Sequence, residues 1–411
     1  MNRIGIALVG MVGFFVGTPG AAVAQSVEWD GSVLTRFETR GVDGGDDATF
    51  TWLQTRLSAE GTVSPMVRFF AQAQDVRRYG EETSTLDGSA DQFDFHQGFI
   101  EIGVFDESPL WLRLGRQEYE VAFGRLLGRP IWAPTSRAYD GLRAATPLGD
   151  AGRLELFGFQ IAESTGGTNP SDAYLAGAWA EFGFGDARTL HLFAIHDRDD
   201  DGADTQRTTF GTEINGAVGP VGYRVEAIGQ AGTVEGLDLT AGSLLAGFAS
   251  LPVADGRGSL GVGYDRYGGN AAPGAGETAG FSDLFGRNHR FLGFADIFND
   301  PRSNTNGRGL QDLNLRAVWG LRDGLDLRVD YHRFALVDDA GFDEASLADE
   351  IDVQVMGRLI DGLDIRAGGS YVGANPGLTT LGLSAGDQLF GYIQLSAGFD
   401  GGPTVLRGGG R

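Results

Sequence analysis

Polar and apolar residues alternate along most of the chain between residues 25 and 399. In residues 325–331, for example, two leucines, a valine and a tyrosine alternate with Asp326, Arg328 and Asp330. Residues 350–359 and 363–371 follow the same rule. A period of two is typical of β-strands with one apolar face, and the helical period is almost absent. About 18 such runs can be counted, so the pattern predicts an all-β protein.

The connections between these runs alternate between minimal turns and long loops. Gly219-Pro220 and Asp361-Gly362 are two of the short ones, and the longest loop covers about residues 266–307. This arrangement is typical of a transmembrane antiparallel β-barrel with short periplasmic turns and long extracellular loops. A soluble β-sandwich, solenoid or propeller is the alternative. The even strand count and a last run that ends on Phe399 favour a barrel over residues 25–399.

The two ends of the chain differ from the rest. Arg3 precedes an uncharged apolar stretch over residues 4–17, and Ala22-Val23-Ala24 provides a small-x-small cleavage pattern. The stretch is too short to span a membrane, which needs about 20 residues. Residues 1–24 are therefore expected to be a signal peptide that directs the chain out of the cytoplasm. Together with the predicted barrel, this indicates the outer membrane of a Gram-negative cell. A Gly-rich tail is expected over residues 400–411.

The composition of the 411-residue chain excludes several classes of protein. It contains 67 Gly and no Cys, its net charge is −23, and all its Lys and Arg positions are Arg. The lack of Cys excludes disulfide scaffolds, Cys-zinc sites and thiol catalysis. The negative charge argues against nucleic acid as a partner. Most of that charge falls in four predicted loops, residues 41–48, 79–92, 197–205 and 337–350, whereas residues 119–139 carry +2 and residues 266–307 balance at zero.

Arginine recurs on the polar face of the predicted strands, which in a barrel faces the lumen. The strand positions singled out are Arg113, Arg143, Arg316, Arg328, Arg358 and Arg366. Acidic residues occupy the same face, so two interpretations stay open. The arginines could form a charge ladder with acids on neighbouring strands. They could instead line a track for an anionic solute, because the guanidinium fork matches a carboxylate.

Two motif blocks carry a family resemblance. The first comprises residues 112–118 (LRLGRQE), 124–126 (GRL), Trp132 and 137–143 (RAYDGLR), and the second comprises residues 281–285 (FSDLF), 288–291 (NHRF) and 293–296 (GFAD). Together they resemble the alginate-export outer-membrane porin family. The resemblance implies an 18-stranded barrel with an electropositive constriction that secretes a polyuronate. The two long loops would fold over or into the lumen. They would position Arg116, Arg125, Arg137, Asp140 and Arg143, with His289 and Asp296 in support.

Catalytic and metal-binding motifs are weak. Residues 382–386 match a nucleophile elbow, but a strand follows instead of a helix and no His lies downstream. The five His residues show no metal-ligand spacing, so no catalytic residue and no cofactor are expected. Asp197, Asp199 and Asp201 resemble the start of a calcium loop, but Thr208 occupies the twelfth position, where an EF-hand needs Glu. Weak Ca²⁺ binding at this extracellular loop is the one metal site considered.

The leading hypothesis is thus a channel for an anionic polysaccharide, alginate-like, or for its oligomers. A nonspecific or small-solute porin is the alternative within transport, and an outer-membrane surface-binding protein or enzyme is the alternative of another class. The expected partners are the polysaccharide, outer-membrane lipid and lipopolysaccharide, with periplasmic secretion proteins as further candidates. We expect a monomer.

Overall fold

The fold is known from a computed structural model, which describes residues 25–43, 47–79, 93–163, 172–185, 188–199 and 204–406. The predicted signal peptide and the last five residues lie outside this part of the chain. No helix in the described part is both long and apolar enough to cross a membrane.

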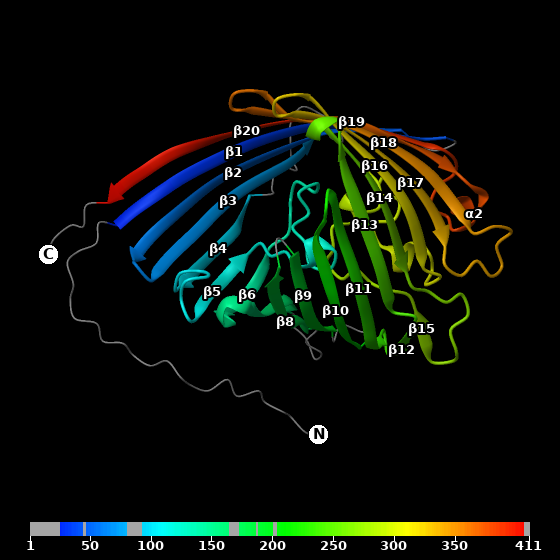
Figure 1. Ribbon diagram of the computed structural model, residues 1–411, viewed down its shortest axis with the longest axis horizontal. Helices are drawn as coiled ribbons and strands as arrows, with labels where there is room; N and C mark the ends of the chain where they lie inside the picture. Colours follow the sequence, from blue (N-terminus) through cyan, green and yellow to red (C-terminus); the bar gives the residue numbers. More distant parts are fainter. Residues whose placement is uncertain are drawn as a thin grey trace, which may run out of the picture.

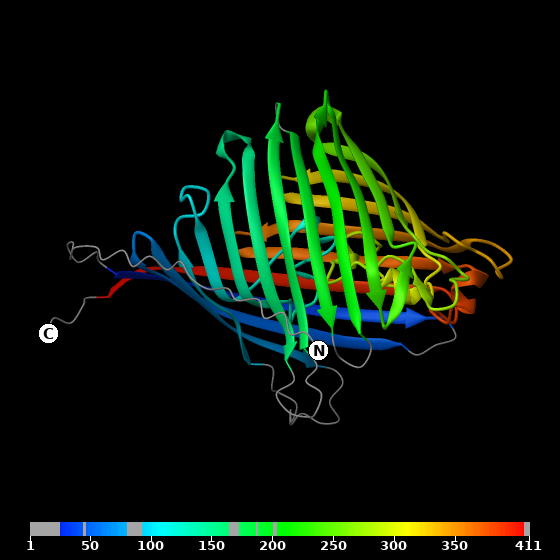
Figure 2. The same cartoon turned by 90° about the horizontal axis from the view of Figure 1, so that it is seen from below.

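Within the described residues, eighteen strands form one antiparallel wall that closes on itself, which confirms the predicted barrel. The wall is continuous in Figures 1 and 2, and β1 closes it by pairing with β20. The strands of the wall are β1 (Gln25–Val42), β2 (Ala48–Ser64), β3 (Val67–Tyr79), β4 (Asp94–Ile102), β5 (Trp111–Gln117), β6 (Tyr139–Pro147), β7 (Gly152–Glu163), β8 (Asp172–Phe184), β9 (Arg188–Asp199), β10 (Thr205–Val218), β11 (Val221–Val234), β13 (Ser243–Val253), β14 (Gly258–Tyr267), β16 (Leu310–Arg322), β17 (Leu325–Leu336), β18 (Ser346–Ile360), β19 (Leu363–Ala374) and β20 (Gln388–Leu406).

Two further short strands, β12 (Leu237–Thr240) and β15 (Glu277–Ala279), pair in parallel at the rim. The alternation predicts a wall strand from about residue 235, but that strand begins at Ser243, because residues 237–240 pair with the long loop instead. At the other end of the chain, β20 continues to Leu406, seven residues past the expected end of the barrel at Phe399.

Helices are few and short. They are η1 (Ala122–Gly124), η2 (Gly149–Ala151), η3 (Ala254–Gly256), η4 (Asn288–Arg290), α1 (Pro301–Asn304) and α2 (Pro376–Thr380).

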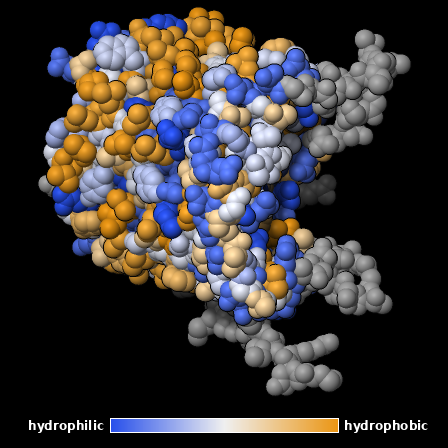
Figure 3. Space-filling view, turned by 90° about the vertical axis from the view of Figure 1, so that its right-hand side faces the viewer, coloured by the Kyte–Doolittle hydropathy of each residue, from blue (hydrophilic) through white to orange (hydrophobic). Residues whose placement is uncertain are grey.

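The two faces of the wall are chemically opposite. On β16, Leu313 and Leu315 are exposed, whereas Asp312 and Asn314, which alternate with them, are buried. An apolar exterior with a polar interior is the reverse of a soluble protein and matches a wall that faces lipid. Figure 3 shows hydrophobic side chains gathered over one side of the molecule.

Candidate functional site

Two long loops meet inside the barrel. The first inner loop (residues 118–138) joins β5 to β6, and the second inner loop (residues 268–309) joins β14 to β16. Phe285 N donates a hydrogen bond to Leu126 O over 2.9 Å, and Gly128 N donates to Phe285 O over 3.0 Å. Leu126 and Leu127 are completely buried at this contact. The loops thus pack on each other as one body, and Figure 1 shows the first within the curve of the wall.

Arg125 fastens this body to the wall. Its guanidinium lies 3.0 Å from Glu226 on β11 and 2.9 Å from Asp265 on β14, and it donates to the Tyr267 hydroxyl over 2.6 Å. Burial alone would lower the pKa of Arg125, but Asp265, Tyr267 and Glu226 outweigh it and raise the pKa well above its usual value. Arg125 was predicted to contact the solute. Because it is fully buried, it acts instead as an anchor.

Trp132 is a second anchor of the first inner loop. Its ring stacks on His289 with centroids 4.1 Å apart, and the Arg36 guanidinium of β1 lies 3.7 Å above it. Arg36 also donates to Trp132 O over 2.7 Å. Tyr392 of β20 completes the contact with a centroid separation of 4.7 Å. The first loop therefore touches opposite parts of the wall, through Arg125 and through Trp132.

A cavity of about 550 Å³ lies between the two loops and the inner faces of β17, β18 and β19. Five arginines line it: Arg137, Arg287, Arg290, Arg328 and Arg366. Among the described residues, Asp296 is its one lining acid, and that carboxylate is already held by His289 at 2.9 Å and by Arg40 at 3.5 Å. The described lining thus has an excess of positive charge.

The lining arginines differ in how they are neutralised. Arg287 and Arg290 share Glu120, at 2.5 Å and 3.6 Å. Burial lowers the pKa of Arg290, and the neighbouring Arg287 charge adds to that effect. Arg137 donates to Phe285 O. Within the described residues, Arg137 and Arg366 have no carboxylate within 4 Å.

The other predicted lumenal arginines mostly form the charge ladder. Arg113 lies 2.6 Å from Glu101, and Arg143 lies 2.6 Å from Glu155. Arg316 lies 2.9 Å from Asp330, which Arg328 also binds. Arg358 lies near the short-turn end, beside a shallow pocket that also includes Asp361 and Asp364. The charge-ladder interpretation therefore describes this part of the wall, and the track for an anionic solute stays a prediction.

Arg116 and Asp140 are not in the lumen. They pair with each other over 2.8 Å on adjacent positions of β5 and β6. Arg113 and Arg143 face inward on these strands, and three residues further along a strand the side chain points the opposite way. Arg116 and Asp140 consequently share the outer face with the exposed Leu114 and Leu142. Their predicted role in the pore was wrong. The motif was assigned to the pore as a whole, although successive residues of a strand point to opposite faces of the wall.

The calcium-loop candidate is only partly described. Asp197 pairs with Arg207 through two hydrogen bonds of 3.1 and 3.0 Å, which occupy both carboxylate oxygens. Asp199 lies at the end of β9, and Asp201 lies outside the described residues.

Arg287 and Arg290 are the lining residues that sequence reasoning missed. The net charge of their loop is zero, so the total charge gave no sign of two arginines that lie three positions apart. Local charge within the second motif block was the signal that could have identified them.

The chain matches the family described as Alginate export over residues 34–378. No curated protein matches it significantly. Solved structures with a similar fold include OccAB4 of Acinetobacter baumannii, with a TM-score of 0.65 and 11% identity, covering 91% of this chain and 98% of that one. OprD of Pseudomonas aeruginosa has a TM-score of 0.65 and 13% identity, covering 91% and 94% of the two chains. OccK3 (OpdO) of P. aeruginosa has a TM-score of 0.64 and 16% identity, covering 92% and 96%. This protein is an outer-membrane β-barrel channel that belongs to the alginate export family.

Proposed function

We propose that this channel passes an anionic polysaccharide of the polyuronate type, or its oligomers, through the arginine-lined cavity. The observation that carries the proposal is the set of five lining arginines around a single, already neutralised acid. We expect transport without catalysis.

The chemistry of the lining suits a carboxylated sugar chain. A guanidinium donates charge-assisted hydrogen bonds to a carboxylate, and Arg137 and Arg366 are the members best able to do so, since no carboxylate of the described chain pairs with them. Arg287 and Arg290 are shared with Glu120. Partial neutralisation keeps each contact weak, and conduction requires several weak sites rather than one tight site.

A small carboxylate is the second candidate solute. OpdK of P. aeruginosa, whose structure was solved with vanillate, has a similar fold, with a TM-score of 0.60 and 14% identity over 91% of this chain and 98% of that one. The cavity of about 550 Å³ also falls within the size range of small-molecule sites. The same arginines would then bind one carboxylate at a time.

Planar-bilayer recording at low salt tests the proposal. Polyuronate oligomers should block the current, and a neutral oligosaccharide of equal length should not. The double variant Arg137→Gln/Arg366→Gln should weaken the block about a hundredfold or more, because each of the two lost charge-assisted contacts is worth about 1.5–3 kcal/mol.

Arg116→Gln is the matched control, since it removes the same charge from the outer face. Equal block by the neutral oligosaccharide would overturn the polyanion role. Equal block by a single uronate and by its oligomers would favour the small-carboxylate channel. Heat-modifiable gel migration establishes that each variant forms the barrel.

A further inference from the structure

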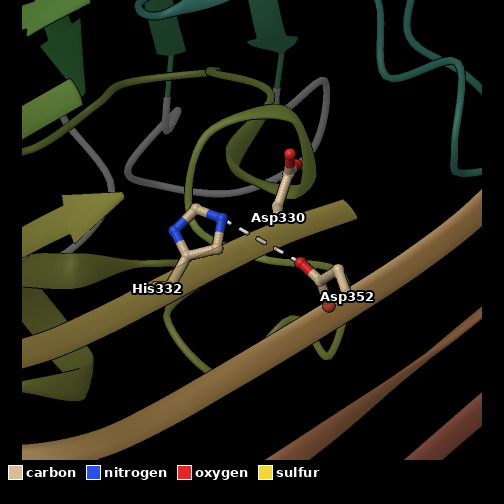
Figure 4. A group of neighbouring side chains, drawn as sticks. All are labelled: Asp330, His332 and Asp352. Carbon is tan, nitrogen blue, oxygen red and sulfur yellow. Dashed lines mark ion pairs between the residues drawn. The ribbon is translucent and has the colours of Figure 1, made fainter. Parts of the chain in front are cut away.

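Three buried side chains converge on the inner wall beside the cavity. Asp330 and His332 project from β17 and Asp352 from β18, and one donor atom of each lies within 4.8 Å of the others. All three are almost completely buried. Figure 4 shows the imidazole of His332 facing the Asp352 carboxylate, with Asp330 on the same side of the ring.

The register of β17 and β18 places these groups side by side. Asp330 lies directly opposite Asp352, and His332 lies directly opposite Glu350. Like charges at directly opposite positions destabilise a sheet. Arg316 and Arg328 both bind Asp330, so one acid of the pair is neutralised twice.

Asp352 and Glu350 are left with too little positive charge. Within the described residues, neither has an arginine within 4 Å, and the ring nitrogen Nε2 of His332 lies 3.9 Å from Asp352 Oδ2. Asp352 Oδ1 and Glu350 Oε2 are buried and form no hydrogen bond. Buried carboxylates without a partner are costly, so a cation or a shared proton at this point would stabilise the wall.

His332 is oriented as a metal ligand would be. Its Nδ1 lies 2.9 Å from Asp312 Oδ2. A carboxylate at that position selects the tautomer protonated on Nδ1, which leaves the lone pair of Nε2 directed toward Asp352. Histidines that bind metals are commonly held by a carboxylate at the other ring nitrogen in this way.

We propose that His332 and Asp352 bind a divalent transition metal of the Zn²⁺ or Mn²⁺ type, with Asp330, which Arg316 and Arg328 also hold, as the third ligand and Asp312 as a positioning residue. One imidazole and two carboxylates form a mixed nitrogen and oxygen donor set that suits these ions better than Ca²⁺, which prefers oxygen ligands alone. Metal-ligand bonds of about 2.0–2.2 Å place donor atoms roughly 3–4 Å apart, so donor atoms that now lie within 4.8 Å of one another would move closer together on binding.

The metal would also brace the lining of the cavity. Ala295 N donates to Glu350 Oε1 over 2.8 Å, and Phe294 N donates to Asp352 Oδ2 over 3.3 Å. These backbone groups belong to the second inner loop, directly beside Asp296 in the cavity lining. A cation on Asp352 would hold that carboxylate, and with it this stretch of the loop, against the wall.

The test uses the full-length barrel in detergent, stripped with a chelator and then titrated with Zn²⁺ at pH 7.5. About one Zn²⁺ per chain should bind in calorimetry and remain after desalting in elemental analysis. His332→Gln and Asp352→Asn should each weaken binding at least tenfold. Asp312→Asn should weaken it about 10- to 100-fold although every ligand is retained.

His196→Gln is the matched control, because His196 is an exposed histidine on β9 and should leave the binding unchanged. Chelation should lower the unfolding temperature of the wild-type barrel but not that of Asp352→Asn. A proton shared by Asp352 and Glu350 is the competing way to neutralise the site. No stoichiometric binding by the wild type, or full binding by His332→Gln, would overturn the metal site.

Discussion

Arg125 and Arg137 lie twelve positions apart on the first inner loop and have different structural roles. Arg125 is fully buried and is bound by Glu226 and Asp265 of the wall. Arg137 lines the cavity and donates to the backbone oxygen of Phe285. Both belong to the motif blocks, and the residue type is identical. The residues that contact an arginine, rather than its motif, therefore decide its role. An arginine bound by buried carboxylates anchors the two packed inner loops, residues 118–138 and 268–309, which together form the plug. An arginine without a carboxylate partner is available to a solute.

The largest expected effect comes from removing the anchor. Arg125→Met should destabilise the barrel by about 3–5 kcal/mol, because two buried carboxylates lose their cation. Denaturant unfolding followed by tryptophan fluorescence measures the change. Arg129→Met is the control on the same loop. Arg129 is half exposed and pairs with Glu118 over 3.1 Å, so its loss should lower the free energy of unfolding by at most about 1 kcal/mol. Equal losses in the two variants would contradict the distinction between anchor and contact.

A second way to loosen the plug touches no arginine. Gly293 adopts a positive φ of +83°, and a Cβ built there would lie 2.5 Å from the Glu350 carboxylate. Gly293→Ala should therefore cost about 2–4 kcal/mol, from a left-handed backbone and from overpacking. Hydrogen exchange of the second inner loop should accelerate.

Gly341→Ala controls for the backbone term of that experiment. Gly341 has a φ of +88°, and a Cβ there meets open space, so only the cost of about 1–2 kcal/mol for the backbone should remain. If both variants exchange alike, Gly293 is not a docking contact of the loop.

The wall was more predictable from sequence than the plug. Alternation in β17 and β18 depends only on a period of two. The sequence alone therefore predicts that Asp326, Arg328 and Asp330 of β17 share the lumenal face. Glu350 was counted with an acidic loop, although it lies in β18 and is completely buried. A strand boundary is set by pairing with its neighbour, and this pairing is not encoded in local residue type.

The proposed metal site could not be predicted from the sequence for a related reason. Asp330 and Asp352 are 22 positions apart and come together only through the register of two strands. No spacing rule along one segment contains that information. Arg116 illustrates the opposite error, since a motif was transferred residue by residue without asking which face each position occupies.

The pH dependence of docking tests the plug without a substitution at any arginine. Burial, with the charge of Asp300 adding to it, raises the pKa of Asp283 to about 7. The docked second inner loop therefore keeps a proton that the undocked loop releases. Docking should be strongest below about pH 4, weaken by about 1.4 kcal/mol per pH unit up to about pH 7, and level off above it. Hydrogen exchange of residues 281–291 measures this, and Asp283→Asn should remove that part of the slope.

The smallest effect should distinguish two lumenal arginines that are not anchors. Arg366 lines the cavity, whereas Arg358 lies exposed near the short-turn end. Arg358→Gln should slow the entry of a polyuronate blocker by less than about threefold, because a solvated charge acts through a screened field. Arg366→Gln should shorten the dwell time of the blocker, since a direct contact governs dissociation. Raising the salt concentration should abolish the Arg358 effect first. If Arg358→Gln shortens the dwell time as much as Arg366→Gln does, the binding site extends to the mouth of the barrel and is not confined to the cavity.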